Sequence, residues 1–471
     1  MHKSEKGFSQ EGWWTATLLM EAMPGCWLNP PPEGWRATGV SIFAPAMRPG
    51  NMVCIWTEKE QGGVAAENIS QLPYPPAALI VSEPDFEIES DVPVYLVDNW
   101  SAALLIMGRY VREQMHGNII GITGSAGKTT CVAMLATALE EWGPVRSSQE
   151  NANLPRGVAW NIASMPWDTP QVILELAIGR MEISSRMVSP TVAMVTNIQA
   201  AHLKYHKSIQ NIARAKAKIF LGMAPGGIAV LNRDMAEWQC VYDAAVKQGL
   251  RVVTYGLREG CDCRLLDYDA ATGRVTADIS GRLLRYVLEV DGQHMALNSV
   301  ATLAVIAALG YSPEKALPNL ARFRALPGRG EVNHLTVAAH PVTVIDDAYN
   351  ANPGSMMAAI TQLNELMQPG RKVIVMGEMA ELGESDEQYY LSLIEAINRS
   401  QITCVYLLGH VYEKFSNVMS ADKQYILLPG IESFRRMYLN HIQDNDIVLF
   451  KGSNATQVWK LVKWLKALAS R

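Results

Sequence analysis

The chain has 471 residues, of which 49% are hydrophobic and 18% are charged, and its 41 basic and 46 acidic side chains give a formal net charge of −5. This balance excludes a disordered chain, which combines low hydrophobicity with high net charge, and it offers no basic excess for binding nucleic acid. Single hydrophobic cores stop growing at about 250–300 residues, so we expect several domains.

The start of the chain and its cysteines predict a cytoplasmic protein without a membrane segment. The apolar stretch that begins at Trp13 is interrupted by Glu21 and falls short of the roughly 20 residues that span a membrane. The polar residues before it do not resemble a signal peptide. The seven cysteines are odd in number and scattered, and the close pair Cys261 and Cys263 lacks a second cluster that would complete a zinc site. We therefore expect free thiols.

The first predicted domain comprises residues 1–115 and is a small α/β module. Short apolar runs broken by Pro and Gly predict strands at Asn51–Trp56, Ala77–Val81 and Val94–Val97. A helical pattern over Trp100–Gln114 follows and ends the domain.

The second predicted domain comprises residues 116–325 and alternates apolar strands with helical patterns, as in a mainly parallel sheet covered by helices. The expected strands are Asn118–Thr123, Val172–Leu176, Val192–Ile198, Ile228–Leu231 and Val252–Tyr255. A polar, alternating segment at about 261–290 predicts an antiparallel insertion, and an Ala-rich helix is expected over 296–310. The breakers of Leu326-Pro-Gly-Arg-Gly mark the boundary with the third domain.

The third predicted domain comprises residues 326–471. Its strand-like runs recur at intervals of roughly 20–30 residues, which is typical of βα units in a doubly wound, Rossmann-like sheet. They are Val342–Ile345, Lys372–Met376, Cys404–Leu408, Tyr425–Leu428 and Ile447–Phe450. The predicted fold class is therefore α/β with three domains.

The sharpest local motif is glycine-rich and lies between an apolar strand and a helical pattern from about Cys131 to Glu140. Glycines let backbone N–H groups turn towards anionic oxygens, the start of a helix adds free donors, and a lysine adds positive charge. The strict pattern G-x-x-x-x-G-K-[ST] is not met, because Ile122 stands where its first glycine belongs. The context still predicts nucleotide phosphate binding by Gly124, Ser125, Ala126, Gly127, Lys128, Thr129 and Thr130, with the hydroxyl of Thr129 placed for Mg²⁺.

Several stretches together resemble the Mur ligase family, which joins a carboxylate to an amine at the expense of ATP. The most specific is Asp346-Asp-Ala-Tyr-Asn-Ala-Asn-Pro-Gly-Ser-Met356, which looks like the C-terminal signature of the UDP-N-acetylmuramoyl-tripeptide:D-alanyl-D-alanine ligase subgroup. The segment Thr123–Thr130 is that family's form of the phosphate loop, and supporting segments lie at 195–203, 213–216, 328–330, 376–383 and 451–453. The resemblance implies an N-terminal acid-substrate domain, a central ATPase and a C-terminal domain that closes on nucleotide and amine.

The resemblance also implies catalytic roles. Glu175 matches an Mg²⁺ ligand, His202 matches the histidine near a second Mg²⁺, and Lys216 matches a lysine that many members carry as a carbamate. With Thr129 these are the expected metal ligands, and with Lys128 the expected catalytic residues. From the residues alone, Lys216 is better explained as a solvated helix lysine and His202 as an ordinary core or surface histidine. Glu175 is instead a carboxylate in an apolar strand, which is costly to bury unless it is metal-bound or paired.

Other matches concern the nucleotide and the amine. Asn298 matches an adenine-side asparagine, Arg329 an arginine that reaches phosphate from the C-terminal domain, and Asp347 an acid near the ribose. An arginine suits that task because its donors form a planar fork. Candidates for contact with the amine, which could instead cap a helix starting near Pro353, are Tyr349, Asn350, Asn352 and Ser355.

Two stretches depart from the subgroup, and both concern the acid substrate. In the family an Asp-Ser-Arg run helps to hold the uridine nucleotide, but within Gly39–Gly50 the acid and hydroxyl are replaced by Phe and Ala. A site built on hydrogen bonds loses its ligand when those groups are removed. At Glu150-Asn-Ala-Asn153 the subgroup tends to show an Asn-Asn-Glu run instead.

We therefore expect an ATP- and Mg²⁺-dependent ligase that joins an amino acid or dipeptide amine to a small-molecule carboxylate through an acyl phosphate. The departures favour a diverged paralogue whose acid lacks UDP, and the alternative is the peptidoglycan ligase itself. A non-catalytic ATP-binding regulatory or partner protein is a hypothesis of another class, against which the retained Lys128, Glu175, His202 and Lys216 argue. No nucleic acid or membrane partner is expected.

Overall fold

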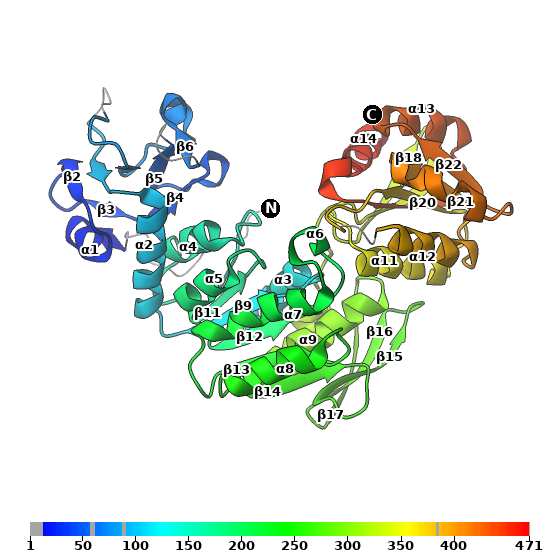
Figure 1. Cartoon of the computed structure of the whole chain (residues 1–471), viewed down its shortest axis with the longest axis horizontal. Helices are drawn as coiled ribbons and strands as arrows, with labels where there is room; N and C mark the ends of the chain where they lie inside the picture. Colours follow the sequence, from blue (N-terminus) through cyan, green and yellow to red (C-terminus); the bar gives the residue numbers. More distant parts are fainter. Residues whose placement is uncertain (1–12, 57–61, 87–90, 383–385, 471) are drawn as a thin grey trace.

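The computed structural model describes residues 13–56, 62–86, 91–382 and 386–470. Figure 1 shows three lobes arranged as a wide V, with the central lobe at its base and the N-terminal and C-terminal lobes forming its arms. The predicted α/β class is confirmed. The polar residues that precede Trp13, and Gly383 of the supporting segment 376–383, lie outside the described residues.

The N-terminal lobe is built on a sheet of order β2-β8-β7-β5-β4, in which only the pair β2–β8 is antiparallel. Its strands are β2 (Cys26–Asn29), β4 (Gly39–Ser41), β5 (Asn51–Trp56), β7 (Leu79–Val81) and β8 (Val94–Leu96). The short strand β6 (Val64–Ala65) pairs with β5, and β1 (Trp14–Thr15) pairs with β3 (Arg36–Ala37) before and after helix α1 (Ala16–Ala22). The three strands expected from sequence are all present.

Helix α2 (Trp100–Gln114) joins the N-terminal lobe to the central one. Asn99 caps it by accepting a hydrogen bond from the Ala102 N–H at 2.7 Å. The helix packs closely on α4 (Pro155–Ala163), since a Cβ at Gly108 would lie 3.0 Å from the Cα of Ala159. One hydrophobic cluster consequently runs from Trp14 through α2 and α4 into one face of the central sheet.

The central lobe contains a nine-stranded sheet of order β10-β11-β9-β12-β13-β14-β15-β16-β17. The strands are β9 (Asn118–Thr123), β10 (Val145–Ser147), β11 (Gln171–Glu175), β12 (Val192–Val195), β13 (Ile228–Asn232), β14 (Arg251–Gly256), β15 (Cys263–Asp269), β16 (Arg274–Ile279) and β17 (Arg282–Val287). Pairing is parallel up to β15 and antiparallel from β15 to β17, which confirms the expected insertion.

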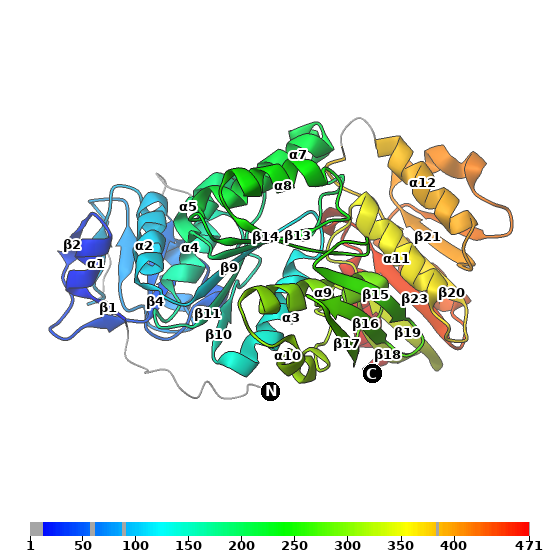
Figure 2. The ribbon, with the colours of Figure 1, turned by 90° about the horizontal axis from the view of Figure 1, so that it is seen from below.

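Helices cover both faces of this sheet because successive strand residues are apolar on alternate sides. Ile120 and Ile122 pack with one set of helices, and Ile119 packs with the other. The first set is α3 (Lys128–Leu139), α9 (Gln293–Ala308) and α10 (Pro313–Leu320), and the second is α4, α5 (Met181–Val188), α7 (Ile209–Ala217) and α8 (Trp238–Lys247). Figure 2 shows the sheet between them.

The C-terminal lobe is a doubly wound sheet of order β18-β19-β23-β20-β21-β22, parallel except for the pair β18–β19. Its strands are β18 (Glu331–Val337), β19 (His340–Asp346), β20 (Lys372–Gly377), β21 (Cys404–Leu408), β22 (Gln424–Leu428) and β23 (Asp446–Lys451). One apolar cluster lies under α11 (Pro353–Glu365) and α12 (Asp386–Asn398), and another under α13 (Ile431–His441) and α14 (Trp459–Ala469). The strand β18 was not predicted.

The carboxyl ends of parallel strands from two lobes line one cavity of about 670 Å³. Groups that follow β9, β11 and β12 form its central wall, and groups that follow β19, together with the end of β23, form its C-terminal wall. Ligands bind at this edge in open α/β sheets.

The three main sheets lie within residues 26–96, 118–287 and 331–451, and the domain boundaries near 115 and 325 stay predictions. Within the described part of the chain, every helix is too short or too polar to cross a bilayer.

Candidate active site

The glycine-rich loop connects β9 to α3, and two of its glycines are required by the backbone. Gly124 has a φ of +154°, and a Cβ there would lie 1.8 Å from Oγ1 of Thr196. Gly127 has a φ of +78° and is the N-cap of α3, which begins at Lys128. Other residues are strained at such angles. Gly127 belongs to the strict phosphate-loop pattern, whereas Gly124 lies outside it, and Ile122 at the position of the first glycine is part of β9.

Residues that follow β12 hold the loop in place. The backbone N–H groups of Ser125 and Ala126 both donate to Oδ1 of Asn197, at 3.1 and 2.9 Å, and the hydroxyl of Thr196 donates to the carbonyl of Ala126 at 2.6 Å. The loop is therefore preformed, and the first turn of α3 presents backbone donors of the kind that bind phosphate. Asn197 lies in the supporting segment 195–203, and its polar position just after a buried strand is the signal that could have identified it.

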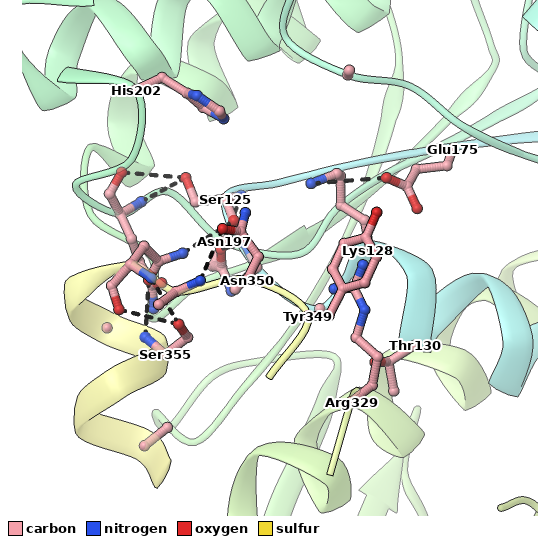
Figure 3. Close-up of a pocket in the computed structure, with 18 of the residues that line it drawn as sticks. Ser125, Lys128, Thr130, Glu175, Asn197, His202, Arg329, Tyr349, Asn350 and Ser355 are labelled. Atoms are coloured by element: carbon pink, nitrogen blue, oxygen red, sulfur yellow. Dashed lines mark hydrogen bonds and ion pairs between the residues drawn. The ribbon is translucent and has the colours of Figure 1, made fainter. Parts of the chain in front are cut away.

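Glu175 lies at the end of β11 and is only 5% exposed. The Thr129 hydroxyl donates to its Oε2 at 2.7 Å, the Asn153 amide donates to its Oε1 at 2.8 Å, and Nζ of Lys128 is 4.0 Å from Oε1. Figure 3 shows Glu175 and Lys128 beside each other. The carboxylate therefore has the neutral and charged partners that its burial requires.

Asn153 is a site residue that sequence reasoning missed, because it lies in the stretch that departs from the subgroup. The Ala177 N–H donates to the carbonyl of Asn153 at 2.9 Å, so the segment before α4 lies alongside the segment that follows β11. This pairing directs the Asn153 amide at Glu175.

Lys216 is a buried amine beside the loop. Its side chain is 2% exposed, and its Nζ donates to the carbonyl of Gly124 at 2.8 Å, which also accepts from Nζ of Lys128 at 3.1 Å. Burial holds the pKa of Lys216 well below its ordinary value, and the positive charge of Lys128 lowers it further, whereas Glu175 opposes the shift. Burial likewise lowers the pKa of Lys128. Lys216 is therefore not a solvated surface lysine.

His202 is not brought to Glu175. It has a left-handed φ of +60°, and its Nδ1 contacts a carboxylate oxygen of Glu381 from the C-terminal lobe. The Lys204 N–H donates to the carbonyl of the same glutamate at 3.1 Å. In Figure 3, His202 lies across the cavity from Glu175 and Lys128. The structure therefore makes Glu381 a contact between lobes that the sequence did not single out.

Arg329 reaches the phosphate loop from the C-terminal lobe. Its guanidinium lies over the ring of Tyr349, 4.0 Å from the centroid, and Nη2 donates to Oγ1 of Thr129 at 3.0 Å. Gly328 has a φ of +72° and permits this stacking, since a Cβ there would lie 3.0 Å from Cβ of Tyr349. Arg329 is therefore held where a planar cation can meet a phosphate.

The remaining nucleotide-side candidates also line the cavity. Asp347 accepts from Nζ of the buried Lys451 at 2.6 Å, and that amine also donates to the carbonyl of Asn350 at 3.2 Å. Asn298 lies against the loop, since a Cβ at position 127 would be 3.2 Å from its Oδ1. Burial lowers the pKa of the neighbouring His294, while Asp347 opposes that shift. Lys451 and His294 are further residues that the predicted site lacked.

Asn352 and Ser355 form a capping box at the start of α11. The Ser355 N–H donates to Oδ1 of Asn352 at 2.9 Å, and the Asn352 N–H donates to Oγ of Ser355 at 3.0 Å. The amide of Asn352 also donates to the carbonyl of Ser125 at 3.3 Å. The structure thus shows the capping role, and contact of Tyr349, Asn350, Asn352 and Ser355 with an amine stays a prediction.

The donors at the loop fit a magnesium ion only in part. Mg²⁺ prefers oxygen ligands and is usually held by one or two carboxylates together with substrate phosphates and water. Thr129 and Glu175 offer such oxygens 2.7 Å apart. His202 and Lys216 offer nitrogen, and Lys216 would offer oxygen only as a carbamate. Among the described residues, no group of three or more His, Cys, Asp or Glu side chains is gathered for a metal.

Comparison with known proteins gives the family of this site. A model of the Mur ligase middle domain matches residues 122–306, and a model of the Mur ligase glutamate ligase domain matches residues 328–454. The UDP-N-acetylmuramoyl-tripeptide–D-alanyl-D-alanine ligase of Rickettsia prowazekii is 29% identical over 401 residues, covering 82% of this chain and 86% of that protein. The ligase of the same name from Escherichia coli is 28% identical over 399 residues, covering 83% and 85%.

Solved structures agree over nearly the whole chain. A crystal structure of MurF from Acinetobacter baumannii is 26% identical, covers 97% of this chain and 99% of its own, and superposes with a TM-score of 0.82. A MurF ligase from Thermotoga maritima in complex with ADP shares the fold, with a TM-score of 0.75, 24% identity and coverage of 92% and 98%. The chain belongs to the Mur ligase family and is an ATP- and Mg²⁺-dependent ligase that forms amide bonds.

Proposed function

We propose that this ligase joins the amine of an amino acid or dipeptide to a carboxylate that lacks a UDP group, through an acyl phosphate. The observation that carries the chemistry is the convergence of Lys128, Lys216 and Glu175 at the phosphate loop, all of them largely buried. Lys128, Arg329 and the backbone donors of the loop supply the positive charge that an attack of a carboxylate on a phosphate needs, because two anions must meet.

The residues of the two walls have distinct tasks in this proposal. Lys128, Arg329 and the first turn of α3 orient the phosphates of ATP, and a bound Mg²⁺ would neutralise charge on them next to Thr129 and Glu175. A carboxylate oxygen of the acid attacks the γ-phosphorus of ATP. The bond between that phosphorus and the bridging oxygen breaks at the same time, and ADP leaves with the oxygen. The amine then attacks the carbonyl carbon of the acyl phosphate, inorganic phosphate leaves, and the nitrogen loses a proton.

The proposed carbamate of Lys216 is supported by the state of its amine. Only a neutral amine reacts with CO₂, and burial beside Lys128 lowers the pKa of Lys216 and so favours the neutral form. A carbamate would place an anion between Lys128 and the neighbouring groups, which pairs the buried positive charge. His202, held by Glu381 across the cavity from Lys128, is proposed to act from that side.

The absence of UDP from the acid is supported by the N-terminal segment that replaces the Asp-Ser-Arg run. Phe43 is 46% exposed there and precedes a short 3₁₀ turn, Ala44–Ala46. The nearby Ser41 hydroxyl donates to the carbonyl of Phe43 and is occupied within its own segment. These groups give a nucleotide few hydrogen-bonding partners.

A second candidate is the peptidoglycan ligase itself, which is what the two bacterial relatives are named for, at 28–29% identity over about four fifths of this chain. Both candidates are proposed to work in the cytoplasm, where ATP is available, and neither requires nucleic acid or a membrane.

The test supplies ATP, Mg²⁺ and panels of carboxylates and amines, and measures release of ADP and phosphate. Amine-dependent ADP release with acids that lack UDP is expected, and it should be lost in Lys128→Ala. Efficient turnover only with UDP-muramoyl tripeptide and D-alanyl-D-alanine would replace the first candidate by the second. No amine-dependent release, with Lys128→Ala equal to the wild type, would indicate a non-catalytic ATP-binding protein.

A further inference from the structure

Three apolar side chains at the cavity have no part in the chemistry above. Leu154 is 54% exposed, Tyr205 is 64% exposed, and Ile178 is partly buried, yet all three line the same cavity as Lys128 and Glu175. We call these three residues the apolar mouth. Large apolar groups that remain in water at the edge of a polar cavity are typical of ligand recognition.

Two residues of the apolar mouth, Leu154 and Ile178, are tied to the reacting groups by short covalent and hydrogen-bonded paths. Leu154 directly follows Asn153, whose amide donates to Glu175, and Ile178 lies three residues after Glu175. The hydrogen bond from the Ala177 N–H to the Asn153 carbonyl keeps these two segments side by side. Leu154 lies over Gly179, where a Cβ would be 2.9 Å from Cδ2 of the leucine.

Leu154 also occupies a position at which leucine is unfavourable for the local structure. It is the N-cap of α4 and provides no side-chain acceptor to that helix. Ser, Thr, Asp and Asn are preferred at N-caps because their oxygens bond the free N–H groups. An exposed leucine at this position goes against the residue preference of N-caps. Departures from local preferences are expected at functional sites.

We propose that the apolar mouth binds an apolar side chain on the carbon next to the reacting carboxylate of the acid substrate. This inference rests on the proposed function, in which that carboxylate meets the γ-phosphate at the loop that carries Lys128. With the carboxylate at the phosphate loop, the adjoining substituent faces the rim formed by Leu154 and Ile178. A charged substituent would lose water there against the side chains of Leu154 and Ile178, which offer it no polar atom.

The test compares acids that differ only in this substituent. The probes are acetyl-alanyl-leucine, acetyl-alanyl-lysine and acetyl-alanyl-glutamate, each with ATP, Mg²⁺ and D-alanyl-D-alanine, and ADP release is measured. The wild type should prefer the leucine acid by about 10-fold or more in kcat/KM, the range set by apolar contacts in a pocket. Leu154→Asn should lose most of that preference through KM for the acid, with KM for ATP unchanged.

Thermal unfolding separates this role from a structural one. Asparagine is a better N-cap than leucine, so Leu154→Asn should keep or raise the melting temperature while it lowers activity on the leucine acid. Met367→Asn is the matched control, since Met367 is 81% exposed and lies outside the cavity, and it should leave the preference intact. Ile178→Ala provides a second variant whose folding is checked by the same melting curve.

The outcomes distinguish this inference from the function on which it rests. A wild type that uses the lysine or glutamate acid as well as the leucine acid, or a Leu154→Asn variant that keeps the preference, overturns the inference while the ligase function stands. Turnover restricted to UDP-muramoyl tripeptide, with none of the three probes used, overturns it too. A wild type that turns over no acid overturns both.

Discussion

In the central wall of the cavity the charged side chains of Glu175 and Lys216 are buried and bonded to neutral groups of the same lobe, whereas in the C-terminal wall the charged side chains of Asp347 and Arg329 are only partly buried. Glu175 has partners in Thr129 and Asn153 from its own lobe. Across the cavity, Asp347 is paired with Lys451, and Asn352 with Ser355. Among the groups that cross between the walls in the described residues are Arg329, Glu381 and the Asn352 amide.

This difference suggests a division of labour. A preorganised set of buried charges stabilises developing charge at no cost of reorganisation during the reaction, so the central wall should determine the chemical step. A wall joined to it by single hydrogen bonds should instead determine binding and closure. Substitutions in the two walls should therefore differ in size and in the kinetic constant that they change.

The largest effect is expected for Lys216→Ala in the central wall. Loss of a buried group beside the transferring phosphate should lower kcat by about 10³-fold, with a small effect on KM for ATP. The matched control is Lys218→Ala, because Lys218 is an exposed lysine two residues away on the same segment. A loss of similar size in both variants would contradict a special role for Lys216.

The same lysine gives a pH prediction. Because burial lowers the pKa of Lys216 from 10.5, its neutral amine is more populated at pH 7–8 than that of an ordinary lysine, and the population grows as pH rises. The mass of one CO₂ on Lys216 should therefore increase with pH and with added bicarbonate. Mass spectrometry checks this, and an adduct that is independent of bicarbonate would contradict it.

A smaller effect is expected for Arg329→Ala, which removes a crossing contact. We expect kcat/KM for ATP to fall by about 10–100-fold, mostly through KM, because one charged hydrogen-bonding partner of the phosphates is lost. Arg329→Lys should rescue little, since an ammonium lacks the planar fork that stacks on Tyr349. Arg109→Ala, at an exposed surface pair, is the control. A fall in kcat with no change in KM for ATP would contradict the expected difference between the two walls.

Asn153→Ala should lower kcat by about 10-fold. A hydrogen bond to a charged group contributes about 1.5–3 kcal/mol, and the lower end applies here because Glu175 keeps the Thr129 hydroxyl as a partner. Its amide orients Glu175, so the Mg²⁺ concentration at half-maximal rate should rise as well. Asn211→Ala removes an exposed asparagine in α7 and serves as the control. If the Mg²⁺ dependence is unchanged, Asn153 contacts the acid substrate and does not orient Glu175 for the metal.

The smallest effect on catalysis is expected for Ser355→Ala, which removes one half of the capping box. The free energy of unfolding should fall by about 1 kcal/mol, measured by denaturant titration. Asn352→Asp keeps the cap acceptor but removes the amide that donates to Ser125, so it separates capping from contact between lobes. A large rise in KM for the amine in Ser355→Ala would instead support contact with the substrate.

Sequence patterns predicted those elements whose boundaries carry strong local signals. Helix α2 and strands β9 and β21 begin and end where expected, because an Asn cap, Gly residues or sharp changes in polarity mark their ends. Strand β18 escaped prediction because Glu331, Asn333 and His334 make it polar, and it is stabilised by its antiparallel pairing with β19. Pairing with a distant strand leaves little trace in a local window.

The site was predictable where one motif supplies several groups, as in the loop from Gly124 to Thr130. It was not predictable where two distant segments meet. The contact of His202 with Glu381 joins residues 179 positions apart, and the approach of Asn153 to Glu175 depends on a backbone pairing outside any sheet. The resemblance identified Lys216, but only packing of α7 against the loop could show that its amine is buried.

The hydrophobic cluster that continues from Trp14 through α2 into the central lobe restricts how this enzyme could be recombined with its relatives. A chimera that exchanges residues before about 115, made to transfer acid specificity, would bring in a foreign α2 against the resident α4. Gly108 and Ala159 approach closely at that junction, so a graft that changes either one separates the helices. Successful chimeras should therefore carry α2 and α4 from the same parent, and with α4 they would also inherit Leu154.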